Sequence, residues 1–197
     1  VCTMLALSQA GATYRCLAPD ADQLHVVNHL TGQPADGESR NMLVESARIA
    51  RGEIDPLGAV NVRDYDAFYF LGGYGAAKNL CTFAVDGADC TVNPDVARVV
   101  KEAHAAGKPL AFVCIAPVIA AKVLGATGAK LTIGTDAATA GAINEMGGTH
   151  VECPVKEVVI DEQNRIISTP AYMTARSLTE VYEGLTKTVQ GLLKMIG

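Results

Sequence analysis

Cys114 is the residue of this sequence whose type and position point most directly to chemistry. It follows residues 109–113, a continuous apolar run typical of a strand that is buried on both faces. A helix is predicted to begin at about Ala116, and the positive end of a helix dipole favours the nucleophilic thiolate of a nearby cysteine. A small buried thiol in a core strand explains the position about as well, since free cysteines are often plain core residues.

A glycine-rich turn is the second feature that could take part in chemistry. Gly72-Gly73-Tyr74-Gly75 follows another continuous apolar run, residues 67–71. Because ligands bind at the carboxyl ends of strands in open parallel sheets, we expect this turn and Cys114 to lie together. One glycine N–H and the N–H of Ile115 would then form an oxyanion hole beside the thiol. Tight packing between the strand and the next helix also explains the glycines, which match neither the G-x-G-x-x-G motif nor a phosphate-binding loop.

Three polar residues are further candidates. Lys78 and Asn79 follow the glycine turn, where they would contact an anionic substrate, although helix capping or solvation explains them about as well. Glu45 lies one helical turn from Arg48, which is the spacing of a surface ion pair. Because apolar residues flank Glu45 on the predicted helix, a partly buried carboxylate near the site is the alternative.

The other cysteines and the histidines predict no metal site. The six cysteines are far apart and include no C-x-x-C pair, so neither a zinc knuckle nor a dithiol redox motif is indicated. His25 and His29 lie in a segment that is predicted to be extended, which would separate them by roughly 13 Å. Reduced thiols in a cytosolic compartment are the simplest interpretation.

Composition excludes several classes of function. The chain has 197 residues, of which 49% are hydrophobic, and this suits one compact domain with a sizeable core. The net charge is −5 and no block of Lys and Arg occurs, so a nucleic-acid partner is not expected. No apolar run approaches the roughly 18 residues of a membrane span, so no membrane partner is expected either.

The elements that must position these residues alternate between strands and helices, as βαβ units do. Predicted strands cover residues 14–17, 67–71, 109–113, 130–134, 158–160 and 165–167. Predicted helices cover residues 39–51, 94–106, 116–124, 139–146 and 174–196, and residues 1–7 also have a helical pattern. We therefore predict a single three-layer α/β domain over residues 1–197, with a mostly parallel sheet and helices on both faces.

Several stretches together resemble one known family. They are Asn28-His29-Leu30-Thr31-Gly32, residues 45–54, residues 72–80, Cys114-Ile115-Ala116-Pro117 and Thr169-Pro170-Ala171-Tyr172-Met173. These are similar to the enhancing-lycopene-biosynthesis proteins, a family that includes the mitochondrial ES1-type proteins of vertebrates. The Cys114 stretch also resembles the cysteine elbow of the wider DJ-1/PfpI, class I glutamine amidotransferase-like superfamily.

The resemblance implies a flavodoxin-like fold, a homodimer and a cysteine nucleophile that needs no cofactor. It implies weak glyoxalase-type activity on a small-molecule carbonyl substrate, a 2-oxoaldehyde such as methylglyoxal. Carried over residue by residue, Cys114 is the nucleophile and Gly73 and Ile115 are the oxyanion donors. Gly72, in the same glycine turn, is a further candidate for substrate contact. Related cysteine hydrolases place a His where this chain has Ile115, so the general base is not identified. A non-catalytic regulator or thiol redox sensor linked to isoprenoid metabolism is therefore the alternative, and the mitochondrion is the alternative compartment.

The resemblance also implies a first strand that residues 1–13 do not contain. In the flavodoxin-like strand order that strand lies between the second and third strands. We therefore expect about 20 further residues upstream of Val1, carrying an acidic group that partners Cys114.

Overall fold

The computed structural model describes residues 1–197, which form two compact units. The larger unit consists of Val1–Tyr14 together with Asn61–Gly197, and the smaller unit is Arg15–Val60. Cys114 and the glycine turn belong to the larger unit, and Glu45 belongs to the smaller one. No helix combines the length and the apolar character needed to cross a membrane.

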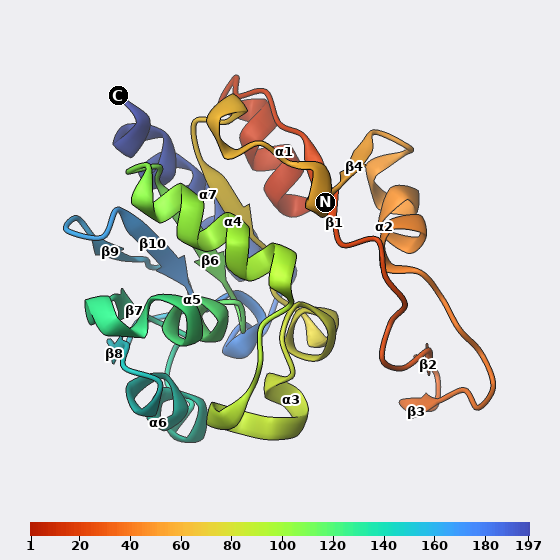
Figure 1. Cartoon of the computed structure of the whole chain (residues 1–197). Coiled ribbons are helices and arrows are strands. Elements are labelled where there is room, and N and C mark those ends of the chain that lie inside the picture. Colours follow the sequence, from red (N-terminus) through yellow and green to blue (C-terminus); the bar gives the residue numbers. More distant parts are fainter. The chain divides into compact units, whose positions relative to one another are not determined.

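A four-stranded sheet forms the centre of the larger unit (Figure 1). Its order is β5 (Phe68–Phe70), β6 (Leu110–Val113), β10 (Ile166–Thr169) and β9 (Val159–Asp161). The first three strands are parallel, and β9 is antiparallel to β10. Every residue of β6 and β10 is buried. The continuous apolar run 109–113 therefore correctly predicted a strand covered on both faces, whereas the run 67–71 is only partly buried, with Leu71 half exposed.

Helices cover both faces of this sheet. On one face, α4 (Pro94–Ala105) and α5 (Pro117–Leu124) pack against β6, and Figure 1 shows both in front of the strands. On the other face, α7 (Leu178–Ile196) contacts β6 and β10, and α1 (Cys2–Gln9) packs on α7. The predicted α/β architecture, with helices on both faces of a mostly parallel sheet, is confirmed.

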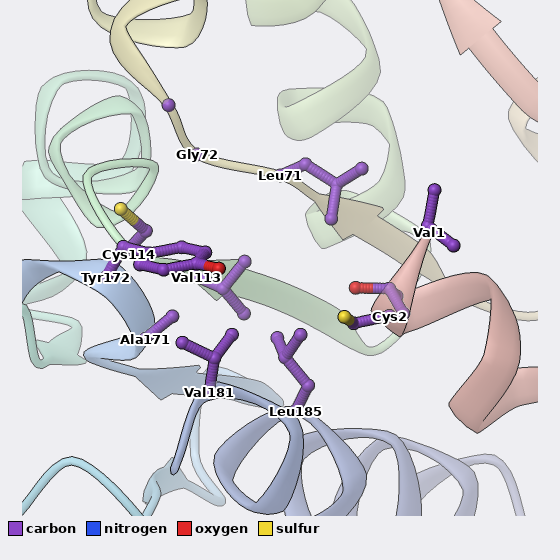
Figure 2. Close-up of a pocket in the computed structure, with 12 residues that line it drawn as sticks. Val1, Cys2, Leu71, Gly72, Val113, Cys114, Ala171, Tyr172, Val181 and Leu185 are labelled. Atoms are coloured by element: carbon purple, nitrogen blue, oxygen red, sulfur yellow. The ribbon is translucent and has the colours of Figure 1, made fainter. Parts of the chain in front are cut away.

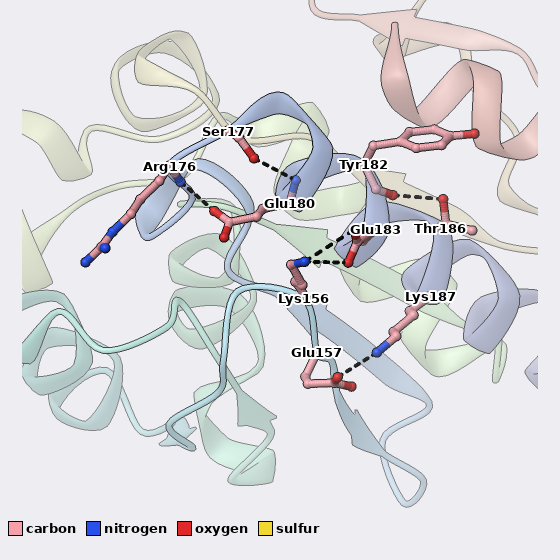
Figure 3. Close-up of polar contacts among 9 residues, drawn as sticks. All are labelled: Lys156, Glu157, Arg176, Ser177, Glu180, Tyr182, Glu183, Thr186 and Lys187. Atoms are coloured by element: carbon pink, nitrogen blue, oxygen red, sulfur yellow. Dashed lines mark hydrogen bonds and ion pairs between the residues drawn. The ribbon is translucent and has the colours of Figure 1, made fainter.

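Local sequence signals explain where the two long helices begin. Asn93 caps α4 by accepting hydrogen bonds from the N–H groups of Asp95 and Val96, as the Asn-Pro-Asp sequence predicts. In α7, Ser177 Oγ accepts from the N–H of Glu180, whose carboxylate accepts from the N–H of Arg176 (Figure 3). This is a capping-box type of arrangement, and it starts the helix four residues after the predicted position 174.

Ion pairs then hold the segment before β9 against α7. Lys156 pairs with Glu183 and Glu157 pairs with Lys187, at 3.0 and 2.6 Å (Figure 3). These residues are half exposed, so each pair contributes at most about 1 kcal/mol.

The remaining elements of the larger unit are short. They are α3 (Phe83–Asp86), β7 (Lys130–Leu131), α6 (Ala137–Glu145) and β8 (Thr149–His150), with β7 parallel to β8. A π-helical turn covers Ala76–Leu80, directly after the glycine turn. The predicted strand at 130–134 is thus shorter than expected.

The smaller unit contains a parallel pair of strands, β1 (Cys16–Ala18) and β4 (Ile54–Pro56). They are connected through the hairpin of β2 (Val27–Asn28) and β3 (Gln33–Pro34) and through α2 (Met42–Ala50). The α2 helix was predicted, whereas β4 was not.

Candidate functional site

Cys114 occupies a strained elbow at the carboxyl end of β6. Its φ is +61°, in the left-handed region that non-glycine residues rarely adopt. Such a conformation costs on the order of 1–2 kcal/mol and persists only where the surroundings hold it. One such contact is the hydrogen bond from the N–H of Cys114 to the carbonyl of Thr169, at 3.0 Å, which ties the elbow to the end of β10. The α5 helix begins at Pro117, so the thiol lies between a strand end and a helix start, as predicted.

Gly72 packs so closely against this elbow that no side chain fits there. A Cβ on Gly72 would lie 2.5 Å from the Cβ of Cys114 and 2.7 Å from the carbonyl oxygen of Val113. It would also lie 3.0 Å from the backbone nitrogen of Ile115. The glycine therefore lets the end of β5 come directly beside the cysteine, which is the close approach that a missing Cβ permits.

Two backbone donors next to the thiol have no protein acceptor. Neither the N–H of Gly73 nor that of Ile115 makes a hydrogen bond within the chain. Gly73 has a φ of +104°, and its carbonyl accepts from the N–H groups of Ala76 and Ala77 at 3.0 and 3.3 Å. The carbonyl is thereby fixed at the start of the next helical turn. Unpaired N–H groups beside a nucleophile are the elements from which an oxyanion hole is built.

A cavity of about 250 Å³ lies at the ends of these strands (Figure 2). Its walls come from the ends of β5, β6 and β10, from the first turn of α1 and from α7. The lining residues are Val1, Cys2, Thr3, Leu71, Gly72, Gly73, Val113, Cys114, Ala171, Tyr172, Val181 and Leu185. Figure 2 shows Cys114 and Tyr172 at one end of this space and Cys2 at the other. The cavity is almost entirely apolar, and no charged side chain lines it.

The end of β10 contributes a second left-handed residue to the same cavity. Ala171 has a φ of +44° and is buried, and it is followed by the exposed Tyr172. Three neighbouring parallel strands therefore all end in unusual backbone at one place: the Gly72-Gly73 pair, Cys114 and Ala171. Convergence of this kind at the carboxyl edge of a parallel sheet is typical of ligand sites.

Comparison with known proteins identifies the family of the chain. No protein-family model matches it. It is 47% identical to the human "Glutamine amidotransferase-like class 1 domain-containing protein 3, mitochondrial", over 97% of this chain and 74% of that protein. It is 44% identical to the rat "ES1 protein homolog, mitochondrial", over the same shares. This chain belongs to the ES1 family of amidotransferase-like proteins.

Solved structures agree with that membership. A crystal structure from Ehrlichia chaffeensis, described as an isoprenoid biosynthesis protein with an amidotransferase-like domain, matches this ES1-family chain with a TM-score of 0.91. The two are 36% identical, and the match covers 100% of this chain and 89% of the other. Glyoxalase III from Candida albicans matches with a TM-score of 0.61 at 14% identity, over 98% and 84% of the two chains. At this low identity, the match to glyoxalase III shows a shared fold alone.

The structure places the other predicted site residues away from the cavity wall or in the smaller unit. Lys78 lies over the ring of Tyr74, 5.6 Å from its centroid, and neither Lys78 nor Asn79 lines the cavity. In the smaller unit, Glu45 pairs with Arg48 at 2.8 Å, and its side chain is 27% exposed. Contact of Lys78 and Asn79 with a substrate and a catalytic role of Glu45 stay predictions.

Several residues that line the cavity were not among the site residues predicted from the sequence. Ala171 and Tyr172 were part of a family stretch, and that signal could have identified them. Cys2, Val181 and Leu185 carry no comparable signal, because only the packing of α1 and α7 brings them to the cavity.

Three other thiols of this ES1-family chain, those of Cys81, Cys90 and Cys153, are buried. Burial raises the pKa of Cys81 to about 11. Burial also raises the pKa values of Cys90 and Cys153 above the ordinary range. These thiols are consequently protonated at neutral pH and poor nucleophiles. No group of three or more His, Cys, Asp and Glu side chains is arranged to hold a metal ion.

Proposed function

We propose that Cys114 is a nucleophile that acts on small 2-oxoaldehydes such as methylglyoxal, with a weak glyoxalase-type activity. The observation that carries this proposal is the left-handed Cys114 at the edge of a cavity, next to the unpaired N–H groups of Gly73 and Ile115. A glyoxalase III with the same fold supports the proposal at the level of fold.

The proposed reaction needs no external oxidant or reductant. The Cys114 thiolate attacks the aldehyde carbon, a C–S bond forms, and the carbonyl electron pair moves to the oxygen, where the N–H groups of Gly73 and Ile115 stabilise it. The proton on the former aldehyde carbon is then removed and another is delivered to the neighbouring ketone carbon. This step oxidises the first carbon to a thioester and reduces the second to an alcohol. Water hydrolyses the thioester to a 2-hydroxy acid and restores the thiol.

The identity of the base that moves this proton is a separate proposal. The sequence does not identify this base. A catalytic role of Glu45, which pairs with Arg48 in the smaller unit, stays a prediction. The test is Glu45→Gln, which should lower kcat for 2-oxoaldehydes and leave alkylation of Cys114 unchanged if that prediction is right.

The composition of the cavity wall favours a second candidate function. No Asp, Glu, His or Lys side chain of residues 1–197 lines the cavity, and this favours a function of the thiol that needs no general base. In this alternative, the Cys114 thiolate attacks a hydroperoxide, takes up one oxygen as sulfenic acid and releases the alcohol or water. The oxidised chain would then act as a sensor or regulator. The Ehrlichia relative, described as an isoprenoid biosynthesis protein, suggests isoprenoid metabolism as the process that is regulated.

One experiment separates the two functions. Consumption of methylglyoxal and formation of lactate are measured for the wild type, Cys114→Ala and the control Cys16→Ala, which removes another partly exposed thiol. We expect Cys114→Ala to lose at least about 100-fold in rate, as loss of a nucleophile does, and Cys16→Ala to keep the rate. Turnover by Cys114→Ala would rule out the nucleophile. No turnover by the wild type, together with stoichiometric sulfenic acid at Cys114 after peroxide treatment, would establish the sensor.

Compartment and assembly are further proposals. The human and rat relatives carry names that say mitochondrial, and these names favour the mitochondrial alternative over the cytoplasmic prediction. A homodimer is proposed from the family resemblance. Cell fractionation and analytical ultracentrifugation would test the two proposals.

A further inference from the structure

Thr169 is the last residue of β10, and its backbone contacts the elbow that carries the thiol. Its carbonyl accepts the N–H of Cys114 at 3.0 Å. Thr169 lies opposite Val113 in the parallel ladder, so this hydrogen bond follows directly after the last paired residues. A left-handed φ such as that of Cys114 persists only where the surroundings hold it. The position of the Thr169 carbonyl therefore helps to determine the conformation of Cys114.

The side chain of Thr169 makes a second hydrogen bond, to a different part of the chain. Thr169 is fully buried, and its hydroxyl donates to the carbonyl of Glu157 at 2.7 Å. Glu157 belongs to the segment before β9, and its carboxylate pairs with Lys187 of α7 (Figure 3). The hydroxyl thus ties the end of β10 to a segment that α7 holds in turn.

A glycine on α7 lets the helix come close to the same hydroxyl. A Cβ on Gly184 would lie 2.9 Å from Oγ1 of Thr169 and 2.8 Å from the carbonyl oxygen of Val155. The hydroxyl is therefore enclosed by β10, by residues 155–157 and by α7. A methyl group in its place needs about 3.5 Å to its neighbours, which is more than the hydrogen bond to Glu157 spans, so it would displace the end of β10.

We propose that Thr169 is a positioning residue, whose side chain keeps Cys114 in the left-handed conformation in which the thiol reacts. This inference rests on the proposed nucleophile, and it applies to both proposed reactions. Without the hydroxyl, the Glu157 carbonyl is unpaired, the end of β10 shifts, and its hydrogen bond to the N–H of Cys114 weakens. The net contribution of one hydrogen bond corresponds to about a fivefold change in population, and we expect a change of that size in the reactivity of Cys114.

The test measures alkylation of Cys114 by iodoacetamide in the wild type and in three variants. Thr169→Val keeps the shape of the side chain without the hydroxyl, and Thr169→Ser keeps the hydroxyl. Ser168→Ala is the matched control, because Ser168 is equally buried on the same strand and its loss also leaves one backbone group unpaired, the N–H of Thr132. We expect Thr169→Val to react about fivefold more slowly, and Thr169→Ser and Ser168→Ala to react at close to the wild-type rate.

Urea denaturation of the same proteins separates positioning from a general loosening of the fold. Similar losses of stability in Thr169→Val and Ser168→Ala, with slow alkylation in Thr169→Val alone, support the positioning role. A wild-type alkylation rate in Thr169→Val, or equally slow alkylation in both variants, would overturn it. If Thr169→Val does not fold, Thr169→Ala replaces it, because alanine removes the hydroxyl without adding a methyl group in its place.

Turnover of methylglyoxal shows whether the positioning role and the proposed function fail together. If the wild type has no turnover but loss of the hydroxyl still slows alkylation of Cys114, the glyoxalase function alone falls. If Cys114 in the wild type is alkylated no faster than Cys16, both the nucleophile and its positioning by Thr169 are wrong.

Discussion

Two residues of the sheet share the same rare backbone conformation in very different surroundings. Cys114 follows β6 with a φ of +61°, and Arg165 precedes β10 with a φ of +54°, at the opposite end of the neighbouring strand. Arg165 lies in the turn of the β9–β10 hairpin. Its carbonyl accepts from the N–H of Leu110, and its guanidinium donates to the carbonyl of Met195. At this end of the sheet, the left-handed residue is thus part of a hydrogen-bonded turn.

At the Arg165 end, side chains as well as backbone make hydrogen bonds, although the buried Nε of Arg165 has no partner. Asp161 accepts hydrogen bonds from the N–H groups of Lys130 and Asn164 and from the side-chain amide of Asn164, at 2.8 to 3.1 Å. At the Cys114 end, the N–H groups of Gly73 and Ile115 are unpaired and an apolar cavity lies beside them. Backbone strain alone therefore does not indicate a site. Strain together with unused donors and a cavity does.

The largest expected effect concerns how fast the cysteine thiols react. A thiol with a pKa of about 11, such as Cys81, is ionised at pH 7 in only about one molecule in ten thousand. We expect iodoacetamide to modify Cys114 at least about 100 times faster than Cys81, with Cys90 and Cys153 also slow. Peptide mass spectrometry of a labelling time course measures the rates. If a buried cysteine reacts first at neutral pH, the assignment of the elbow loses its support.

The next difference concerns the close approach at Gly72. Gly72→Ala forces a methyl group onto the Cβ of Cys114 and the Val113 carbonyl, and we expect a loss of about 1–3 kcal/mol in the free energy of unfolding. The displaced elbow should also slow the alkylation of Cys114. A Cβ at Gly73 would meet no atom within 4 Å, but the φ of +104° makes the β-branched side chain of Gly73→Val strained, and we expect lost turnover and a smaller loss of stability.

Gly141, in the middle of α6, is the matched control for both changes. A Cβ there meets no atom within 4 Å, and Gly141→Ala should raise stability by up to about 1 kcal/mol. Urea denaturation of the three variants gives the comparison. Normal turnover and stability in Gly73→Val would mean that the glycine turn is required only for packing.

The smallest effect on Cys114 is expected from a change at the Arg165 end. Burial by itself would raise the pKa of Asp161, but the hydrogen bonds from Asn164 and from the N–H of Lys130 outweigh it and hold the pKa below its usual value. The stability that this lowered pKa provides is complete above the unfolded-state pKa of about 3.9 and is lost as the pH falls through the folded-state value.

Asp161→Asn should therefore lower the free energy of unfolding by about 2 kcal/mol at pH 7, because one amide is left unpaired. It should also reduce the further loss of stability that the wild type shows below a pH of about 4. Unfolding curves between neutral and acid pH measure both effects. Alkylation of Cys114 serves as the control, since it should be unchanged. A change in that rate would show that the two ends of the sheet are coupled.

The sequence predicted those parts of this molecule that depend on local patterns. The caps of α4, the buried runs of β5 and β6 and the β9–β10 hairpin all follow from short-range chemistry. The strand β4 was missed because it has three residues and ends in Pro56, which weakens any strand signal. The π-helical turn over Ala76–Leu80 depends on hydrogen-bond spacing that residue types do not encode.

The candidate site was predicted less completely, for a different reason. The position of Cys114 after a buried strand is a local signal, and the structure places it where that signal indicated. The left-handed φ of Cys114 and of Ala171 depends on neighbours that are distant in sequence, such as Gly72. The cavity wall from α1 and α7 joins residues more than a hundred positions apart. Such contacts require the tertiary fold.

The hydrogen bonds of Asp161 also bear on how readily copies of this protein aggregate. A sheet that ends in a free strand presents unpaired backbone groups on which another chain can add a strand, and such addition begins aggregation. Here the segment that contains β7 lies against β9 and β10, and two side chains hold it there. Asp161 accepts the N–H of Lys130, and Ser168 accepts the N–H of Thr132, at 2.8 and 3.0 Å. These two side chains thus keep the segment that contains β7 on the last two strands of the sheet, and its loss from that place would expose more of them to another copy of the chain.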